Sequence, residues 1–273
     1  MPSGTCGPEG CAVIAVQPDQ ATLLEAGSTV ISNYLGHMFS DEVAPQAYLV
    51  DSHVANVEAK AHFHRTDQFQ VILSAGFKMG SHSVAPISIH YVDSFSPYGP
   101  LIGDDSGFVF YVLRAHAENQ EFVMPESRGT LEKARHDLGL GPRRGYTATV
   151  GLSEGWPADI AAPEIVDVLS PDVDGVAAFT MRVPSEASVD GPDPSAGGGQ
   201  FYIVVNGTWE HEGSTLGPRS LVWVASDEPA PLLRAGPEGL EVMGAQFSRD
   251  AAPIPAGAPT GLSYRDLMTP TTA

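Results

Sequence analysis

The residues with the clearest chemical potential lie between positions 59 and 76. His62 and His64 are separated by one residue, and because side chains alternate across a strand, both imidazoles would project from the same face. The polar residues that follow His64 predict a turn, and Gln68 to Leu73 then predicts a second strand. If Gln68 and Gln70 share the inner face with the histidines, this hairpin places a cluster of neutral nitrogen and oxygen donors in a pocket.

A third histidine, His90, lies near the end of the next predicted strand, after Gly80 and Pro86. Three neutral imidazoles suit zinc, iron, nickel or copper, and open coordination positions would admit water, oxygen or substrate. The alternative is a polar barrel in which the same histidines hold no metal. His82 could take the place of His90, but it precedes Pro86 in a predicted turn, so we rank it as a pocket residue at best.

Two further side chains are candidates to contact a substrate. Gln70 alternates with Gln68 on the predicted inner face, and Tyr98 lies in a loop rich in glycine and proline, residues 94–107. Aromatic residues in such loops more often close the mouth of a barrel, so this role competes with a purely structural one.

The composition favours strands over long helices. The chain has 273 residues, of which 29 are glycine and 23 are proline, which points to many turns. Its 14 basic and 33 acidic residues give a formal charge of -19, which would repel nucleic acid and anionic membrane surfaces. No basic segment precedes an apolar run at the N-terminus, and no apolar stretch is long enough to cross a membrane. We therefore expect a soluble, cytoplasmic protein.

The strand pattern occurs twice along the chain. We expect an N-terminal arm (1–25), a first unit (26–150) and a second unit (151–273), because the segment Gln200–Gly207 echoes Gln68–Gly76. Residues 29–39 carry apolar side chains at helical spacing and could form a short helix, and residues 130–138 give the best helix in the chain. Two copies of a short-strand unit imply two small barrels or sandwiches.

These motifs resemble the cupin superfamily, and the duplication resembles a bicupin. The first cupin motif has a His-x-His pair, a glutamate three or four residues later and a closing glycine, which His62, His64, Gln68 and Gly76 match with glutamine in place of glutamate. The second motif has a glycine, a proline and a histidine, which Gly80, Pro86 and His90 match. The resemblance implies an all-β fold of two cupin-like barrels, each a double-stranded β-helix or jelly roll, with few short helices.

The resemblance also implies a divalent metal ion in the first barrel, such as Fe, Zn, Ni or Mn. His62, His64 and His90 would hold it, with Gln68 as the fourth ligand or as a hydrogen-bond partner. An amide in place of a carboxylate removes one negative charge, so the metal would be held less tightly and be a stronger Lewis acid. The second unit has Gln200 at the glutamate position but no His-x-His pair, so we expect it to bind no metal and to brace the first. The resemblance to this family also suggests a homodimer.

We therefore expect a metal-dependent bicupin enzyme that acts on a small organic molecule. A dioxygenase-type oxidoreductase is the first choice, with a lyase or isomerase as relatives of it, and Gln68, Gln70 and Tyr98 would position the bound group. The alternative is a non-catalytic cupin that binds a small ligand or serves as a scaffold. The missing glutamate and the bare second barrel support this alternative.

Two other motifs in the sequence have competing interpretations. Gly151-Leu-Ser-Glu-Gly155 matches a nucleophile elbow, but Pro157 and Pro163 spoil the helix that an elbow requires, so a serine hydrolase is disfavoured. Cys6 and Cys11 could form a disulfide loop or half of a metal site, although two thiols in a loose arm are the simpler interpretation.

Overall fold

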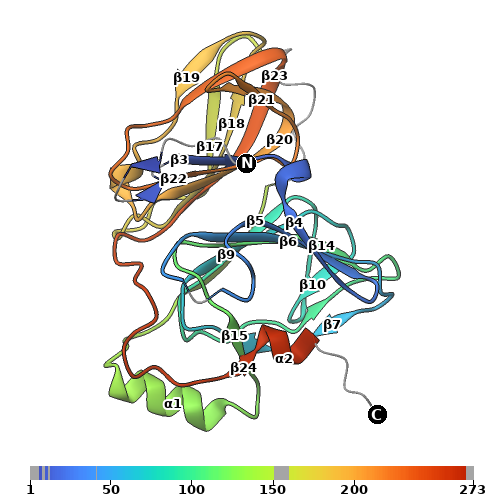
Figure 1. Ribbon diagram of the computed structural model, residues 1–273, viewed down its shortest axis with the longest axis vertical. Helices are drawn as coiled ribbons and strands as arrows, with labels where there is room; N and C mark the ends of the chain where they lie inside the picture. The colour runs from blue at the N-terminus through green and yellow to red at the C-terminus, as the bar shows by residue number, and fades with distance from the viewer. Residues whose placement is uncertain (1–5, 8–9, 12, 41, 151–159, 269–273) are drawn as a thin grey trace. The chain divides into compact units, whose positions relative to one another are not determined.

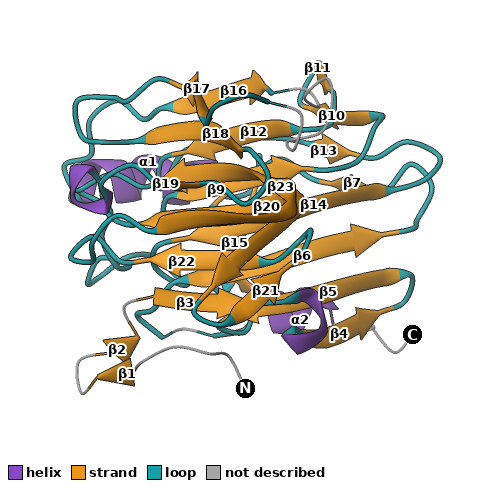
Figure 2. Cartoon of the chain, turned by 90° about the horizontal axis from the view of Figure 1, so that it is seen from above, coloured by secondary structure: helices purple, strands orange, loops and turns teal. Residues whose placement is uncertain are grey.

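The computed structural model describes the chain except for residues 1–5, 8–9, 12, 41, 151–159 and 269–273. Strands dominate the described residues, and the two α-helices among them are short, α1 (Arg128–Asp137) and α2 (Tyr264–Met268) (Figure 2). The all-β class expected from the sequence is therefore confirmed. By its contacts the chain forms two compact units, which we call the first unit (residues 22–151 and 252–273) and the second unit (residues 1–21 and 152–251).

This division differs from the expected arm (1–25) and units (26–150 and 151–273) at both ends of the chain. Strand β3 (Val13–Val16) pairs with β22 (Leu221–Val224) inside the sheet of the second unit. Near the other end, β24 (Leu262–Ser263) pairs with β15 (Gln120–Val123) of the first unit, which Figure 1 shows as a red strand beside a green one. Both segments supply backbone partners to strands that would otherwise be edges.

The main sheet of the first unit has seven antiparallel strands in the order β16-β12-β9-β14-β6-β5-β4. These strands are β4 (Thr22–Ala26), β5 (Thr29–Leu35), β6 (Gln46–Ser52), β9 (Gln68–Ile72), β12 (Ser88–Val92), β14 (Phe108–Arg114) and β16 (Gly145–Thr149). Two smaller sheets complete the unit, built from β15 and β24 with β7 (Glu58–Ala59), β8 (His62–Phe63), β10 (Phe77–Met79), β11 (His82–Val84) and β13 (Leu101–Ile102).

The register of the main sheet places one apolar layer and one polar layer on its inner face. Gln70 of β9 lies directly opposite His90 of β12 and Val112 of β14. Directly paired residues of an antiparallel sheet share a face, so these side chains point the same way. Ile72, Phe110 and Val112 join a buried cluster with Phe77 and Leu101. Towards the other end of the strands the same face becomes polar, and the candidate site lies there.

The second unit contains a separate antiparallel sheet with its own core. Its strands are β3 and β22 with β17 (Glu164–Leu169), β18 (Ala177–Val183), β19 (Ser188–Asp190), β20 (Gln200–His211), β21 (Ser214–Leu216) and β23 (Leu232–Gln246). Trp209, Tyr202 and Leu240 are among its fully buried side chains. A two-stranded ribbon, β1 (Cys6–Gly7) and β2 (Gly10–Cys11), pairs Cys6 with Cys11 through the backbone.

The two helical expectations have different outcomes. The helix expected over residues 130–138 is present as α1, which is followed by Gly139 at a φ of 63°. Residues 29–35 are not helical: they form β5, which pairs with β4 on one side and β6 on the other. The β-branched Val30 and Ile31 fit a pleated sheet, and pairing on both sides outweighs the weak helical spacing.

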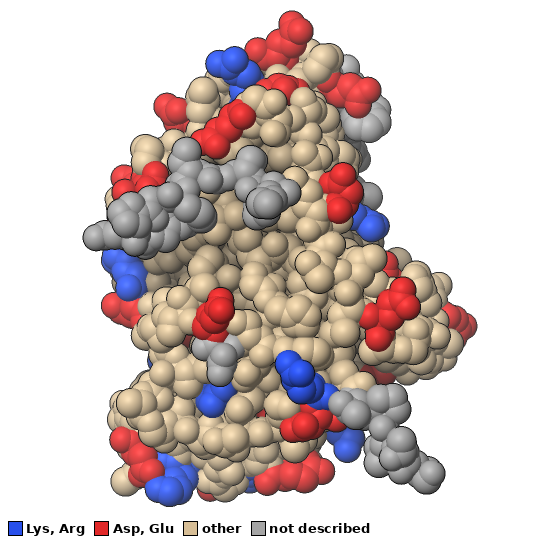
Figure 3. Space-filling view, viewed as in Figure 1, with Lys and Arg blue, Asp and Glu red and all other residues tan. Residues whose placement is uncertain are grey.

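Charged side chains are dispersed over the surface that Figure 3 shows. On this face the Lys and Arg side chains are scattered among Asp and Glu side chains rather than gathered in one region. Among the described residues, no helix is both long and apolar enough to cross a membrane.

Candidate functional site

The structure brings His62 and His64 together inside the first unit. Their ring centroids are 5.0 Å apart, and both side chains are buried. His62 is the first residue of β8 and forms an isolated β-bridge with Tyr98 from the loop of residues 94–107. That bridge fixes the Tyr98 loop against the histidine strand, so Tyr98 becomes part of the site.

The Nδ1 atoms of both imidazoles are held by backbone carbonyl groups. His62 Nδ1 lies 2.6 Å from the carbonyl oxygen of Lys60, and His64 Nδ1 lies 2.8 Å from that of Gln120. A carbonyl oxygen can only accept, so each Nδ1 carries the proton and each neutral ring has its lone pair on Nε2. This is the tautomer that a metal-binding imidazole needs, with the hydrogen bond of the second nitrogen setting the orientation of the ring.

Tyr98 is the common neighbour of the three candidate histidines. Its ring centroid lies 4.6 Å from that of His62, 6.1 Å from that of His64 and 5.5 Å from that of His90. The Tyr98 hydroxyl lies 2.7 Å from His62 Nε2 and, because that nitrogen has no proton, donates to it. Tyr98 therefore does more than close the mouth of the barrel, since its hydroxyl occupies the lone pair of one candidate ligand.

Gln68 points its oxygen away from the histidines. The Oε1 atom accepts from Arg114 Nε at 3.1 Å and from Arg114 Nη2 at 2.9 Å, and the Nε2 atom donates to the Tyr98 hydroxyl at 2.6 Å. A guanidinium group only donates, so the amide oxygen must face Arg114. Both lone pairs of Oε1 are then in use, and as it lies here Gln68 acts as a hydrogen-bond partner of the site rather than as the fourth ligand.

His90 and Gln70 each present a buried polar atom without a partner. His90 Nδ1 lies 2.9 Å from Thr147 Oγ1, whereas His90 Nε2 and Gln70 Oε1 have no hydrogen-bond partner in the part of the chain that the structure describes. The exposed fractions of the two residues are 6% and 2%, so water has little access from outside. Leaving such groups unsatisfied costs free energy, so each of these two atoms is a candidate to bind an ordered water or a ligand.

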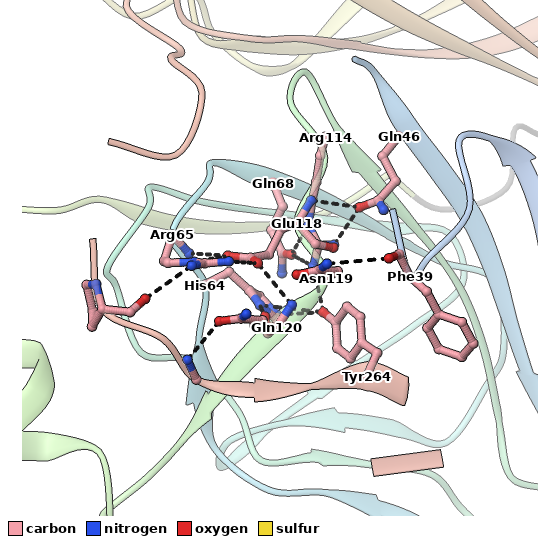
Figure 4. Close-up of polar contacts among 12 residues, drawn as sticks. Phe39, Gln46, His64, Arg65, Gln68, Arg114, Glu118, Asn119, Gln120 and Tyr264 are labelled. Atoms are coloured by element: carbon pink, nitrogen blue, oxygen red, sulfur yellow. Dashed lines mark hydrogen bonds and ion pairs between the residues drawn. The ribbon is translucent and has the colours of Figure 1, made fainter. Parts of the chain in front are cut away.

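A network of polar side chains around Arg114 lies beside His64 and Gln68 (Figure 4). The guanidinium group is fully buried and donates to Gln46, to Gln68, to the carbonyl oxygen of Glu118 and to the Tyr264 hydroxyl. All five of its N–H groups therefore have acceptors. None of these acceptors is a carboxylate, so its charge is balanced only by more distant groups.

A buried ion pair lies beside this network. Arg65 donates from Nε and Nη2 to the two carboxylate oxygens of Glu118, at 2.9 Å and 2.7 Å. The remaining terminal nitrogen, Nη1, donates to the carbonyl oxygen of Pro259. Residues of the C-terminal segment thus line the interior of the first unit. The Tyr264 hydroxyl, for example, lies 3.4 Å from His64 Nε2.

The environment keeps all three imidazoles neutral near neutral pH. Burial lowers the pKa of His62, lowers that of His64 well below its usual value with help from the charge of Arg114, and lowers that of His90 to about 4. Burial also raises the pKa of the Tyr98 hydroxyl, so it remains a proton donor. Neutral imidazoles are the protonation state that binds metal ions.

The residues fit a divalent cation by chemistry, but not by their present spacing. Three imidazoles with oxygen-held Nδ1 atoms, one of them with an unpartnered Nε2, form a suitable donor set. Within the described residues, however, no group of three or more His, Cys, Asp or Glu side chains is placed to hold a metal ion. Binding at these imidazoles therefore requires that the Tyr98 hydroxyl leave His62 Nε2 and that the Tyr264 hydroxyl, 3.4 Å from His64 Nε2, turn away from that nitrogen.

The remaining candidates lie elsewhere. His82 is exposed on β11, and the serine motif at residues 151–155 lies outside the described residues. In the second unit Gln200 is engaged internally: it accepts from Tyr202 and donates to Gln246 and to the carbonyl oxygen of Pro192. A surface groove of about 730 Å³ in the first unit is lined by Lys60 and Glu121 among others, and the three histidines are not among its lining residues.

Three functional contributors were missed by sequence reasoning. Arg114 ends an apolar strand, Glu118 follows in a loop, and Tyr264 is about 200 residues from the histidine it contacts. A charged residue at the end of a buried strand was the one available signal, because such a residue needs a partner. Nothing in the local sequence identified Tyr264.

Comparison with known proteins gives structural matches only. No family model matches the sequence, and no curated protein matches it. The oxalate decarboxylase of Lactobacillus farciminis, solved as a formate complex, superposes with a TM-score of 0.56 at 7% identity, over 91% of this chain and 90% of that chain. The pirin YhhW of Escherichia coli, solved with nickel(II), gives 0.53 at 10% identity, over 86% and 99%.

The oxalate decarboxylase OxdC of Bacillus subtilis is similar to the same degree, with a TM-score of 0.53 at 9% identity, over 87% of this chain and 78% of that chain. Superpositions at such low sequence identity establish the fold alone. The chemistry has to be argued from the residues of the site. On these matches and on its own strand order, the chain has the all-β jelly-roll fold of the cupins.

Proposed function

We propose that this protein is a metal-dependent bicupin enzyme whose first unit acts on a small organic molecule. The observation that carries the proposal is the shared state of His62, His64 and His90. Each is buried and neutral, each has Nδ1 held by an oxygen, and one has an unpartnered Nε2. The fold match to the oxalate decarboxylases and to a pirin in complex with nickel(II) supports the proposal.

In this proposal the three histidines hold the metal ion, which when bound supplies Lewis-acid or redox chemistry. Gln70 Oε1 accepts a hydrogen bond from the substrate, because it is buried, lacks a partner among the described residues and lies directly opposite His90. Tyr98 donates a hydrogen bond either to His62 or to a bound oxygen atom of the substrate. A dioxygenase-type reaction is the finer form of the proposal, with lyase or isomerase chemistry on the same site as its variants.

A non-catalytic ligand-binding cupin is the second candidate, and one observation favours it. The Tyr98 hydroxyl donates to His62 Nε2, and the Gln68 oxygen accepts from Arg114. Two of the atoms that could bind a metal ion are therefore already hydrogen-bonded within the protein. In this alternative a small polar molecule would bind at Gln70 and His90 without being converted.

Replacing His62 and His64 together with alanine is expected to abolish metal binding. The wild-type protein, reconstituted with Fe(II), Mn(II), Ni(II) or Zn(II), should hold about one equivalent of at least one of them, and the double variant less than about a tenth, because two of three ligands are gone. Metal content after gel filtration measures this. The control is His82→Ala, which removes an exposed histidine of β11. Absence of stoichiometric metal in the wild type would refute the enzyme proposal in favour of the second candidate.

A further inference from the structure

Four side chains of the site form a hydrogen-bond chain with one direction. Arg114 donates to Gln68 Oε1, Gln68 Nε2 donates to the Tyr98 hydroxyl, and the Tyr98 hydroxyl lies 2.7 Å from His62 Nε2. His62 Nδ1 then donates to the carbonyl oxygen of Lys60. The chain starts at a group that can only donate and ends at a group that can only accept, so every proton in it is fixed.

Gln68 is the link at which this direction is set. Its amide has an accepting end and a donating end, and Arg114 claims the accepting end. Arg114 is itself held by Gln46, by the carbonyl oxygen of Glu118 and by Tyr264, so it has no freedom to release the amide. The donating end of Gln68 is therefore left for Tyr98, and in this structure the Tyr98 hydroxyl places its own proton on His62 Nε2.

We infer that Gln68, oriented by Arg114, is a positioning residue that keeps the Tyr98 hydroxyl on His62 Nε2 and so controls the access of a metal ion to that nitrogen. The inference rests on the proposed metal function, but it concerns side chains that also interact without metal. In this view Gln68 hinders metal binding because it holds the Tyr98 hydroxyl on His62 Nε2, and not because its own amide fails to bind the metal.

A carboxylate at position 68 would reverse the direction of the chain. The side chain of Gln68→Glu keeps the shape and pairs with Arg114, which has no carboxylate among its acceptors. Its second oxygen accepts the proton of the Tyr98 hydroxyl, which then leaves the lone pair of His62 free. The substitution thus makes His62 Nε2 available as a metal ligand again, and the number of imidazoles in the site stays the same.

The experiment measures the dissociation constants of Co(II) and Ni(II) for the full-length protein by absorption titration. Gln68→Glu is expected to tighten binding by about tenfold or more, and Tyr98→Phe to tighten it to a similar extent, because both free His62. Gln46→Glu is the matched control. It places the same charge beside Arg114 in a fully buried position, but Gln46 is not a partner of Tyr98, so its gain should stay within about threefold.

Combining Gln68→Glu with Tyr98→Phe provides a stricter test. In the Tyr98→Phe background, Gln68→Glu should give only the small gain seen for Gln46→Glu, since His62 is already free. Equal gains from Gln68→Glu in both backgrounds, or equal gains from the two glutamates in the wild type, would overturn the inference.

A measurement on metal-free protein separates this inference from the proposed function. The ¹⁵N chemical shift of His62 Nε2 should move towards the value of a nitrogen without a hydrogen-bond donor in Tyr98→Phe and Gln68→Glu, and should stay unchanged in Gln46→Glu. An unchanged shift in all three variants refutes the hydrogen-bond chain even if metal binds. The expected shifts together with no metal binding in any variant refute both the metal function and the access control.

Discussion

Replacing Arg114 with methionine is expected to lower the free energy of unfolding of the first unit by about 3 to 5 kcal/mol. The substitution removes a fully buried guanidinium group and leaves four acceptors behind. Those are the side-chain oxygens of Gln46, Gln68 and Tyr264 and the carbonyl oxygen of Glu118. Buried acceptors that lose their donors cost more than the net value of the hydrogen bonds themselves.

Two probes allow the stability of the two units to be followed separately. Trp209 and Trp223 are buried in the second unit, so their fluorescence reports on that unit during urea unfolding. Hydrogen exchange of amides in β9 and β14 reports on the first unit. Arg128→Met, at an exposed position of α1, serves as the control and should change stability by less than about 0.5 kcal/mol. A loss below about 1 kcal/mol for Arg114→Met would show that the network has little structural weight.

The candidate histidines were predictable because their signal is local. His62 and His64 stand two residues apart and His90 follows in the next long strand, so alternation across strands was enough to place them near one another. The same reasoning placed Gln70 on the inner face, where the register puts it opposite His90. The hairpin that was expected to join these segments is wrong, however. Strand β8, with His62, pairs with β15, whereas β9, with Gln68 and Gln70, pairs with β12 and β14, so the two strands lie in different sheets.

The role of Gln68 could not be deduced in the same way. Its position in the sequence suggested a metal ligand, but the direction of its amide depends on Arg114, which is 46 residues away. The orientation of an amide is set by a neighbour that can only donate or only accept hydrogen bonds, and here that neighbour is a guanidinium group, which only donates. Knowledge of the position of one residue was therefore insufficient without knowledge of its neighbours.

The ends of the chain show a second limit of sequence reasoning. The four-residue β3 and the two-residue β24 are too short to show a period, and each pairs with a strand far along the chain. Their pairing decides which unit each end completes, and so it brings Tyr264 to His64. Such pairings are set by the free edges of sheets rather than by any feature of the short strands themselves.

Acidification of the metal-free protein is expected to destabilise the first unit between pH 6.5 and 4. Burial lowers the pKa of His90 from 6.5 to about 4 and also lowers the pKa values of His62 and His64. Between these values the unfolded chain binds protons that the folded chain does not, so the free energy of unfolding falls as pH falls. His90 alone accounts for about 3 kcal/mol of this loss by pH 4, at about 1.4 kcal/mol for each unit of pKa shift.

At about one pH unit or more above 6.5, the three imidazoles are almost entirely neutral in both states, so they contribute almost no slope there. The contribution of His90 is isolated by comparing wild type with His90→Gln in urea unfolding followed by hydrogen exchange of the first unit at several pH values. The variant should lose about one proton from the slope between pH 4.5 and 6. Buried carboxyl groups such as Asp67, whose pKa is raised by burial, contribute equally to both proteins and cancel in the comparison. Identical slopes for wild type and His90→Gln would mean that His90 accepts its proton in the folded state near its ordinary pKa, and the interior of the first unit would then be wet rather than closed.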